Sequence, residues 1–275
     1  MSTVAAAAPV REVVATGPRL RCVLALTRVE ARRLITHPAI LVAAGLLVFT
    51  GVRGPGALRF LFLVGMGYFA IGMGTFIAAN LCATRSRRDR TDELFASLPL
   101  RAADRAAAHL LSVTAPLMAA LAVAGVLAAV TRPWAGASAR LDIELRTIMY
   151  GLPDFIQAPL LVAFLGVAGV VLARWFITPV ALPVVFAGIF AMNSLVGLAS
   201  GALRWLNPAA DYSTAGPGSA SVMPWHLVYL GGLILLLAVG ALARRPLTRG
   251  LQLYGAAALA LAALGGVMQV LAASP

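Results

Sequence analysis

Seven long runs of apolar residues, separated by short polar segments, dominate this chain. A run of roughly 20 apolar residues is the length that a helix needs to cross the hydrocarbon core of a bilayer. Helices and closed barrels alone satisfy their backbone hydrogen bonds in lipid, so runs of this length predict helices. The predicted spans are Pro38–Val52, Leu58–Ala83, His109–Val130, Tyr150–Ala173, Ile177–Leu198, His226–Ala243 and Leu251–Ala272.

The composition also indicates that lipid is the solvent of this chain. Hydrophobic residues make up 61% of the 275 residues and charged residues 12%, whereas soluble domains are nearer half apolar and a quarter charged. A soluble fold of this length could not bury so much apolar surface. We therefore expect an all-α, polytopic transmembrane helical bundle over residues 38–272, with six core spans and a candidate seventh at Leu251–Ala272.

The basic residues predict how this bundle is oriented. All 22 are Arg, and with a cytoplasmic N-terminus 16 of them would lie inside and 6 outside. Cytoplasmic connections carry the excess of basic residues, so we expect the N-terminus inside. The Ala-rich residues 1–19 are expected to form a disordered cytoplasmic tail. The lack of Lys and the abundance of Ala, Arg and Gly indicate a high-GC bacterial genome. With its predicted spans, we therefore expect a multi-pass protein of the bacterial plasma membrane.

Residues 20–37 predict an amphipathic helix that lies in the membrane interface. An apolar arc runs along this segment, and Arg21, Arg28 and Arg32 share a separate basic arc. The helix should end at His37, because a residue that precedes proline avoids the helical conformation. The alternative is a first span that begins early. The apolar arc comprises Leu20, Val23, Leu24, Thr27, Ala31, Leu34 and Ile35, and the charged residues assigned to this helix are Arg28, Glu30, Arg32 and Arg33.

The polar segment between the second and third spans predicts a short helix at about residues 91–98. Thr91 is a plausible N-cap, and Asp92 and Glu93 would lie at the positive end of the helix dipole. Leu98 precedes Pro99, which ends the helix. Its apolar side chains could dock in a groove of a partner. The alternative is an ordinary solvated turn, whose Arg residues only set the topology.

Motifs that carry chemistry are absent from the sequence. Without Lys, the chain has no phosphate-binding loop of the GxxxxGK[ST] type and no amine for Schiff-base chemistry. No HExxH or hydrolase motif is present either. The two cysteines form no CxxC, and the three histidines are far apart in sequence. We therefore expect a chain that is not itself an enzyme, with no catalytic residue, metal or cofactor of its own.

A few polar residues fall within the predicted spans, where such residues are often functional. They either hydrogen-bond between helices and lie at the interface, or line a substrate path. The candidates for that path are Asn80, Asp154, Gln157 and Asn193, and Gln269 lies in the last span. Small residues of the second span predict close helix packing, with a dimer interface as one possibility: Gly65, Gly67, Ala70, Gly72 and Gly74. Trp205, Tyr212 and Trp225 are expected to anchor at the headgroups.

Two segments carry a resemblance to a known family. Leu26–Pro38 looks like the helix that precedes the first span of type-2 ABC exporter permeases, and Arg90–Arg101 looks like their coupling segment. The chain departs from the family at Arg90, where Gly is common, in a missing Lys at the start of the third span, and in its seventh apolar run. The residues that the resemblance assigns to coupling are Thr91, Asp92, Glu93, Phe95, Leu98, Pro99 and Arg101.

The resemblance implies the permease subunit of an ATP-driven exporter. A separate ATPase subunit would bind ATP and Mg, and a second copy or a related permease would complete the membrane path, with lipid but no nucleic acid as a further partner. The alternative is a non-transporting membrane scaffold or sensor, or a lipid-modifying membrane enzyme. Such an enzyme would need acids gathered near one interface, and Asp142, Glu144 and Asp154 are the residues available near the outer face.

Overall fold

The structure, a computed structural model, describes residues 16–53, 56–89, 101–137, 152–176, 181–198, 205–209, 219–243 and 247–273. Their regular structure is helical throughout, so the all-α prediction is confirmed for this part of the chain. A helix covers all or most of each predicted span. The helices are α1 (Thr16–Ile35), α2 (Pro38–Arg53), α3 (Gly56–Arg88), α5 (Ala102–Ser112), α6 (Thr114–Ala137), α8 (Leu152–Trp175), α9 (Ala181–Leu198), α10 (Ser219–Leu242) and α11 (Arg249–Ala273).

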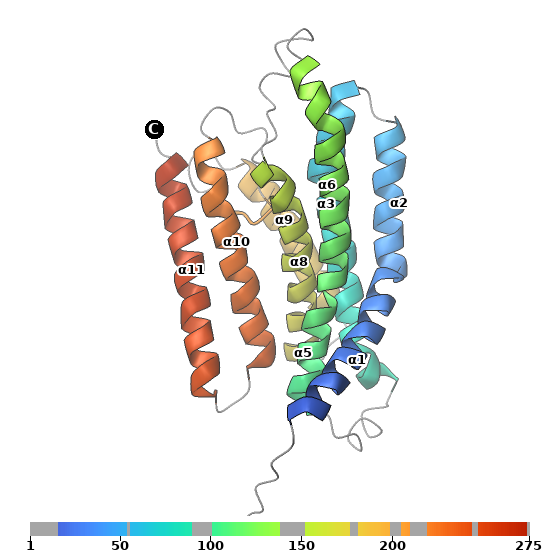
Figure 1. Cartoon of the computed structure of the whole chain (residues 1–275), viewed down its shortest axis with the longest axis vertical. Coiled ribbons are helices and arrows are strands. Elements are labelled where there is room, and N and C mark those ends of the chain that lie inside the picture. The colour runs from blue at the N-terminus through green and yellow to red at the C-terminus, as the bar shows by residue number, and fades with distance from the viewer. Residues whose placement is uncertain are drawn as a thin grey trace, which may run out of the picture.

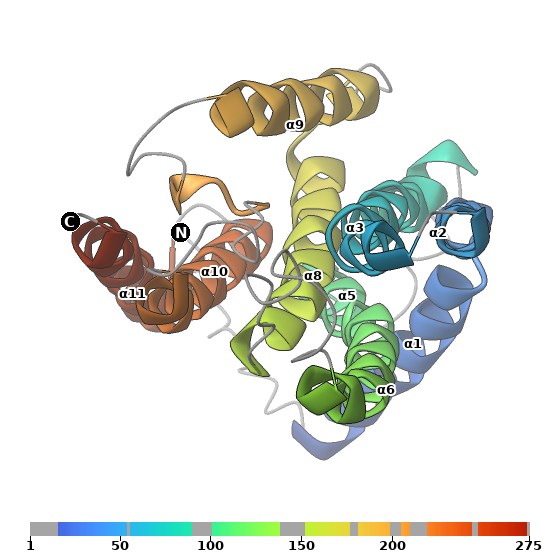
Figure 2. The ribbon, with the colours of Figure 1, turned by 90° about the horizontal axis from the view of Figure 1, so that it is seen from above.

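Helix α8 lies at the centre of the bundle (Figure 2). It packs against α3, α6 and α10, while α2 packs on α3 and α11 packs on α10. Helix α9 lies at the periphery, and α1 crosses obliquely below α2 at one end of the bundle (Figures 1 and 2). The start of α5 and the start of α11 lie at the same end as α1, whereas α11 finishes at the opposite end (Figure 1).

Four helical stretches within the described residues are long and apolar enough to cross a bilayer. Helix α8 is the most deeply buried of them, and α11 is among them, as the candidate seventh span requires. These stretches identify a membrane protein, while the six core spans and the cytoplasmic N-terminus stay predictions. The four are Ala102–Val126, Ile156–Trp175, Ser221–Leu242 and Arg249–Ala273.

The third predicted span differs from the structure at its start. Instead of one helix from His109, α5 begins at Ala102 and α6 takes over after a break at Val113. Pro116 lacks the N–H that would bond to the carbonyl of Ser112, so the helix breaks one turn before it. The Thr114 hydroxyl donates to the Leu111 carbonyl at 2.6 Å and so satisfies one carbonyl at the break.

Close approaches between helices occur at glycines. A Cβ on Gly169 of α8 would collide with the Phe76 carbonyl of α3. A Cβ on Gly74 would lie 2.7 Å from the Ala39 carbonyl of α2, and one on Gly72 would lie 2.6 Å from the Leu165 side chain of α8. Small residues let helices approach closely in lipid. Gly72 and Gly74 therefore pack inside the chain, rather than at the dimer interface that the sequence had left possible.

The contact between α10 and α11 also depends on glycines at the points of closest approach. A Cβ on Gly232 of α10 would collide with the backbone of Ala262 on α11, and one on Gly265 of α11 would lie 2.5 Å from the Tyr229 backbone nitrogen. Backbone cannot yield as a flexible side chain can. Both helices therefore need glycine where they cross.

We expect Gly232→Ala to lower the free energy of unfolding by about 1–3 kcal/mol, because the added methyl group forces α10 and α11 apart. Gly231→Ala is the matched control, since a Cβ there meets nothing within 4 Å. The midpoint of thermal unfolding of the purified chain in mild detergent measures both effects. Equal midpoints for the two variants would contradict the close contact.

Candidate functional site

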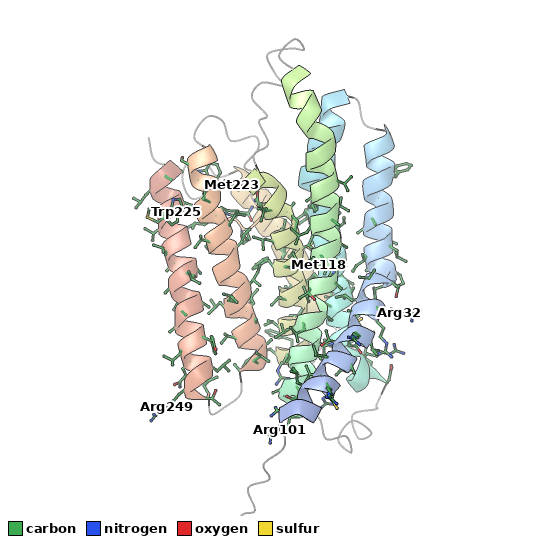
Figure 3. All side chains as sticks on the ribbon, viewed as in Figure 1. Arg32, Arg101, Met118, Met223, Trp225 and Arg249 are labelled. Atoms are coloured by element: carbon green, nitrogen blue, oxygen red, sulfur yellow. The ribbon has the colours of Figure 1, made fainter. Side chains whose placement is uncertain are left out.

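The basic end of the bundle is the end at which α1 lies and at which α3 finishes and α5 and α11 begin. Arg32, Arg101 and Arg249 lie there (Figure 3). The segment with the coupling resemblance starts after α3 and finishes before α5. Both of its flanking helix ends therefore belong to this end of the bundle, which makes it the candidate functional site.

Helix α1 faces the bundle differently from the sequence prediction. It begins at Thr16, earlier than expected, and it packs against α5 through a face on which Val23, Glu30 and Leu34 are buried. Leu20 and Leu24, which the pattern placed with Val23 on one apolar arc, are 59% and 45% exposed. The apolar arc is thus divided between protein contact and the outer surface, because Glu30 has its partners on the bundle side.

An ion pair joins α1 to the start of α5. The Arg19 guanidinium donates to Asp104 through Nε, at 3.0 Å to Oδ1, and through Nη2, at 2.6 Å to the same oxygen. Asp104 Oδ2 also accepts the backbone N–H of Arg101 at 3.1 Å, as a carboxylate in the first turn of a helix can. Asp104 therefore connects α1 to the residue at which the coupling segment finishes.

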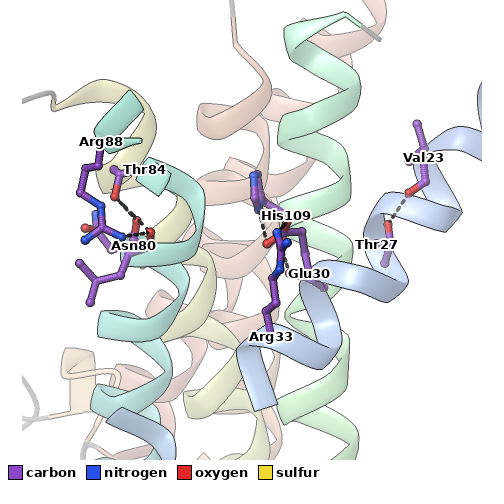
Figure 4. A network of polar contacts seen from close by, with 10 residues as sticks. Val23, Thr27, Glu30, Arg33, Asn80, Thr84, Arg88 and His109 are labelled. Carbon is purple, nitrogen blue, oxygen red and sulfur yellow. Dashed lines mark hydrogen bonds and ion pairs between the residues drawn. The ribbon is translucent and has the colours of Figure 1, made fainter. Parts of the chain in front are cut away.

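A second polar contact lies further along the same two helices (Figure 4). Buried Glu30 accepts a hydrogen bond from Arg33 Nη1 at 2.8 Å, and its other carboxylate oxygen lies 3.9 Å from Nδ1 of His109 on α5. Glu30 is an acid within the apolar pattern of α1. It can be buried there because Arg33 and His109 lie beside its carboxylate. Sequence spacing indicates the pair with Arg33 but carries no signal for His109.

The junction between α1 and α2 is held by His37. Its Nδ1 accepts the backbone N–H of Ala39 at 3.2 Å, which caps the start of α2. Burial lowers the pKa of His37, and the nearby positive charge of Arg88 lowers it further. Both effects favour the neutral imidazole that can accept this hydrogen bond. The predicted helix end at His37 agrees with α1, which finishes at Ile35.

The predicted coupling residues are described only in part. Arg101 is exposed at the start of α5. The remaining six lie outside the described residues, as does the predicted helix at 91–98, which stays a prediction: Thr91, Asp92, Glu93, Phe95, Leu98 and Pro99. Of the charged residues assigned to the interfacial helix, Glu30 is buried, while Arg28, Arg32 and Arg33 are exposed.

Asn80 and Gln157, the two substrate-path candidates whose side chains the structure describes, do not lie together. Asn80 is buried, and its Nδ2 donates to the Gly169 carbonyl of α8 at 3.3 Å, so it hydrogen-bonds between helices. Gln157 lies 12 residues before Gly169 on α8, which is about 18 Å along the helix axis. Asn80 and Gln157 thus lie far apart. The side chains of Asp154 and Asn193 are outside the described part of the chain.

A buried polar pair that the sequence did not predict joins α10 and α11 at the far end. His226 Nδ1 and Gln269 Oε1 lie 2.9 Å apart, and both side chains are fully buried. Trp205 is also buried there, packed against Val222 and Met223, so its predicted role as a headgroup anchor is wrong. Such hydrogen bonds hold helices together in lipid.

An apolar groove of about 480 Å³ is lined mostly by residues of α11. Tyr229 lines it, and its hydroxyl donates to the Leu206 carbonyl at 3.0 Å. No group of His, Cys, Asp and Glu side chains among the described residues could hold a metal ion.

Comparisons of this chain with protein-family models, with curated proteins and with solved structures give no match. The resemblance to type-2 ABC permeases therefore depends on the sequence patterns alone.

We expect Arg19→Glu to lower the midpoint of thermal unfolding by a few degrees, because it places two carboxylates together and detaches α1 from α5. The double variant Arg19→Glu with Asp104→Arg should recover part of the loss by restoring an ion pair of opposite polarity. Arg249→Glu serves as the control, since Arg249 is exposed at the same end of the bundle. An equal loss for Arg249→Glu would show that the charge of the basic end, rather than this contact, sets the stability.

Proposed function

We propose that this chain is the permease subunit of an ATP-driven exporter of the type-2 ABC kind, and that it couples to a separate ATPase subunit through residues 91–98. The observation that carries the proposal is the attachment of α1 to α5 by Arg19 and Asp104, immediately beside the end of that segment. A partner that pushes on the segment would act on α5 at once and on α1 through this ion pair.

Such a connection gives a mechanical route from a partner to the spans. Helix α5 continues after the break at Val113 into α6, which packs on the central helix α8. Helix α1 continues through His37 into α2, which packs on α3. Movement of the segment would therefore reach both α8 and α3. In this proposal the partner binds ATP and Mg, and two permease chains move an amphipathic molecule outward.

No observation favours the alternative enzyme, because the acids that it would need are not described. Asp142 and Glu144 lie outside the described residues, and so does the side chain of Asp154. The permease is therefore the function that we propose, and a membrane scaffold, sensor or enzyme is the alternative that its test can reveal.

The test compares the intact chain with the triple variant Glu93→Ala, Phe95→Ala, Leu98→Ala in a pull-down from native membranes in mild detergent. We expect the intact chain to bring down an ATP-hydrolysing subunit and the triple variant to lose most of it, because the docking side chains are removed. The measurements are identification of the captured proteins by mass spectrometry and the ATPase activity of the eluate.

The matched control is the triple variant Leu247→Ala, Arg249→Ala, Leu253→Ala. It also removes one charge and two apolar side chains that are exposed, and it lies at the start of α11 on the same end of the bundle. The control should keep the ATPase. Absence of any nucleotide-binding partner with the intact chain would contradict the permease proposal. It would favour the alternative enzyme that uses Asp142, Glu144 and Asp154.

A further inference from the structure

The outer surface of α1 carries two neighbouring stripes that the bundle does not cover. Leu20, Leu24 and Ile35 form the first, and they are 59%, 45% and 41% exposed. Their directions fall within roughly 60° around the helix, at about 100° per residue. The face that packs on α5 lies on one side of these residues. This stripe is a narrow apolar surface at the edge of the protein.

The second stripe consists of Arg21, Arg28 and Arg32, which are exposed and fall within roughly 40° on the other side of the apolar stripe. Arg19 and Arg33 have carboxylate partners in Asp104 and Glu30. Among the residues that the structure describes, no carboxylate forms an ion pair with any of the three stripe residues. Arg19 and Arg33 thus have partners within the chain, whereas Arg21, Arg28 and Arg32 are exposed with no described carboxylate paired to them.

The two stripes together fit one occupant. Exposed apolar residues beside a basic row are the arrangement by which a helix lies at the boundary of headgroups and acyl chains. Guanidinium groups bind phosphate with two parallel hydrogen bonds. Anionic lipid attracts basic residues near the membrane surface. A soluble acidic protein would match the arginines but would leave the leucines in water.

We propose that the exposed stripes of α1 bind the phosphate and acyl chains of an anionic phospholipid, and that the bound lipid holds α1 in its place against α5. The arginines take the headgroup phosphate, and Leu20 and Leu24 contact the acyl chains. The ion pair between Arg19 and Asp104 then fixes the other face of the same helix. This proposal does not depend on the exporter function, since it concerns a lipid contact of this chain alone.

The test titrates dioctanoyl phosphatidylglycerol into the purified full-length chain in neutral detergent and follows the midpoint of thermal unfolding. We expect the lipid to raise the midpoint, and dioctanoyl phosphatidylcholine to raise it much less. The pair variant Arg28→Gln, Arg32→Gln should need roughly 30-fold more of the anionic lipid for the same rise, since each basic residue near an anionic surface strengthens binding roughly five- to six-fold. High salt should reduce the response of the intact chain.

Two controls keep the result specific. Arg101→Gln with Arg249→Gln removes the same charge from the same end of the bundle and should leave the lipid response within a few-fold of the intact chain. Arg28→Lys with Arg32→Lys keeps the charge and should keep most of the response. Free glycerol phosphate at equal concentration should have little effect, because it lacks acyl chains.

The proposal is overturned if the Gln pair at 28 and 32 responds like the intact chain. An equal loss in the control pair at 101 and 249 would also overturn it, because net charge would then explain the response. A rise in midpoint with glycerol phosphate as large as that with the lipid would replace the lipid site with a simple phosphate site. Both Arg28 and Arg32 are exposed, so their substitution leaves the packed face of α1 intact.

Discussion

The close packing of α8 against α3 is the contact on which the rest of this bundle depends. Lipid provides no hydrophobic drive for helices to associate, so they must be held by close van der Waals contact and by hydrogen bonds between helices. Gly169 meets both needs, because its missing side chain lets the Phe76 carbonyl approach and its own carbonyl accepts a hydrogen bond from Asn80. With α3 and α8 in place, α2, α6 and α10 each have a surface to pack on.

Two different kinds of interaction hold the two ends of the molecule. At the basic end, Arg19 of α1 pairs with Asp104 of α5, and Glu30 pairs with Arg33 of its own helix, with both arginines partly exposed. Between α10 and α11, glycines allow the close contact, and the buried pair His226 and Gln269 adds a hydrogen bond. Each charged pair keeps one partly exposed partner, Arg19 or Arg33, whereas His226 and Gln269 are both fully buried.

The helices were predictable, whereas the partners of the polar side chains were not. Hydropathy predicts a helix over each apolar run because lipid leaves the backbone little choice. Pro116 carries a readable signal for the break between α5 and α6. Asn80 could be named as a polar residue within a span, but its bond to Gly169 connects positions 89 residues apart in sequence. No periodic pattern contains such a pairing, and the same is true of Glu30 with His109.

The sequence by itself therefore determined that the chain is an all-α membrane protein. Composition and run length suffice for that, since they act through the solvent that each residue prefers. The tertiary structure alone decided which face of α1 meets the bundle. A helix with leucines on its surface can turn them to protein or to lipid, and the two choices differ little in hydrophobic free energy. Pairing of the buried Glu30 and Asp104 carboxylates settles the choice, because an unpaired buried charge costs far more than an exposed leucine at a lipid boundary.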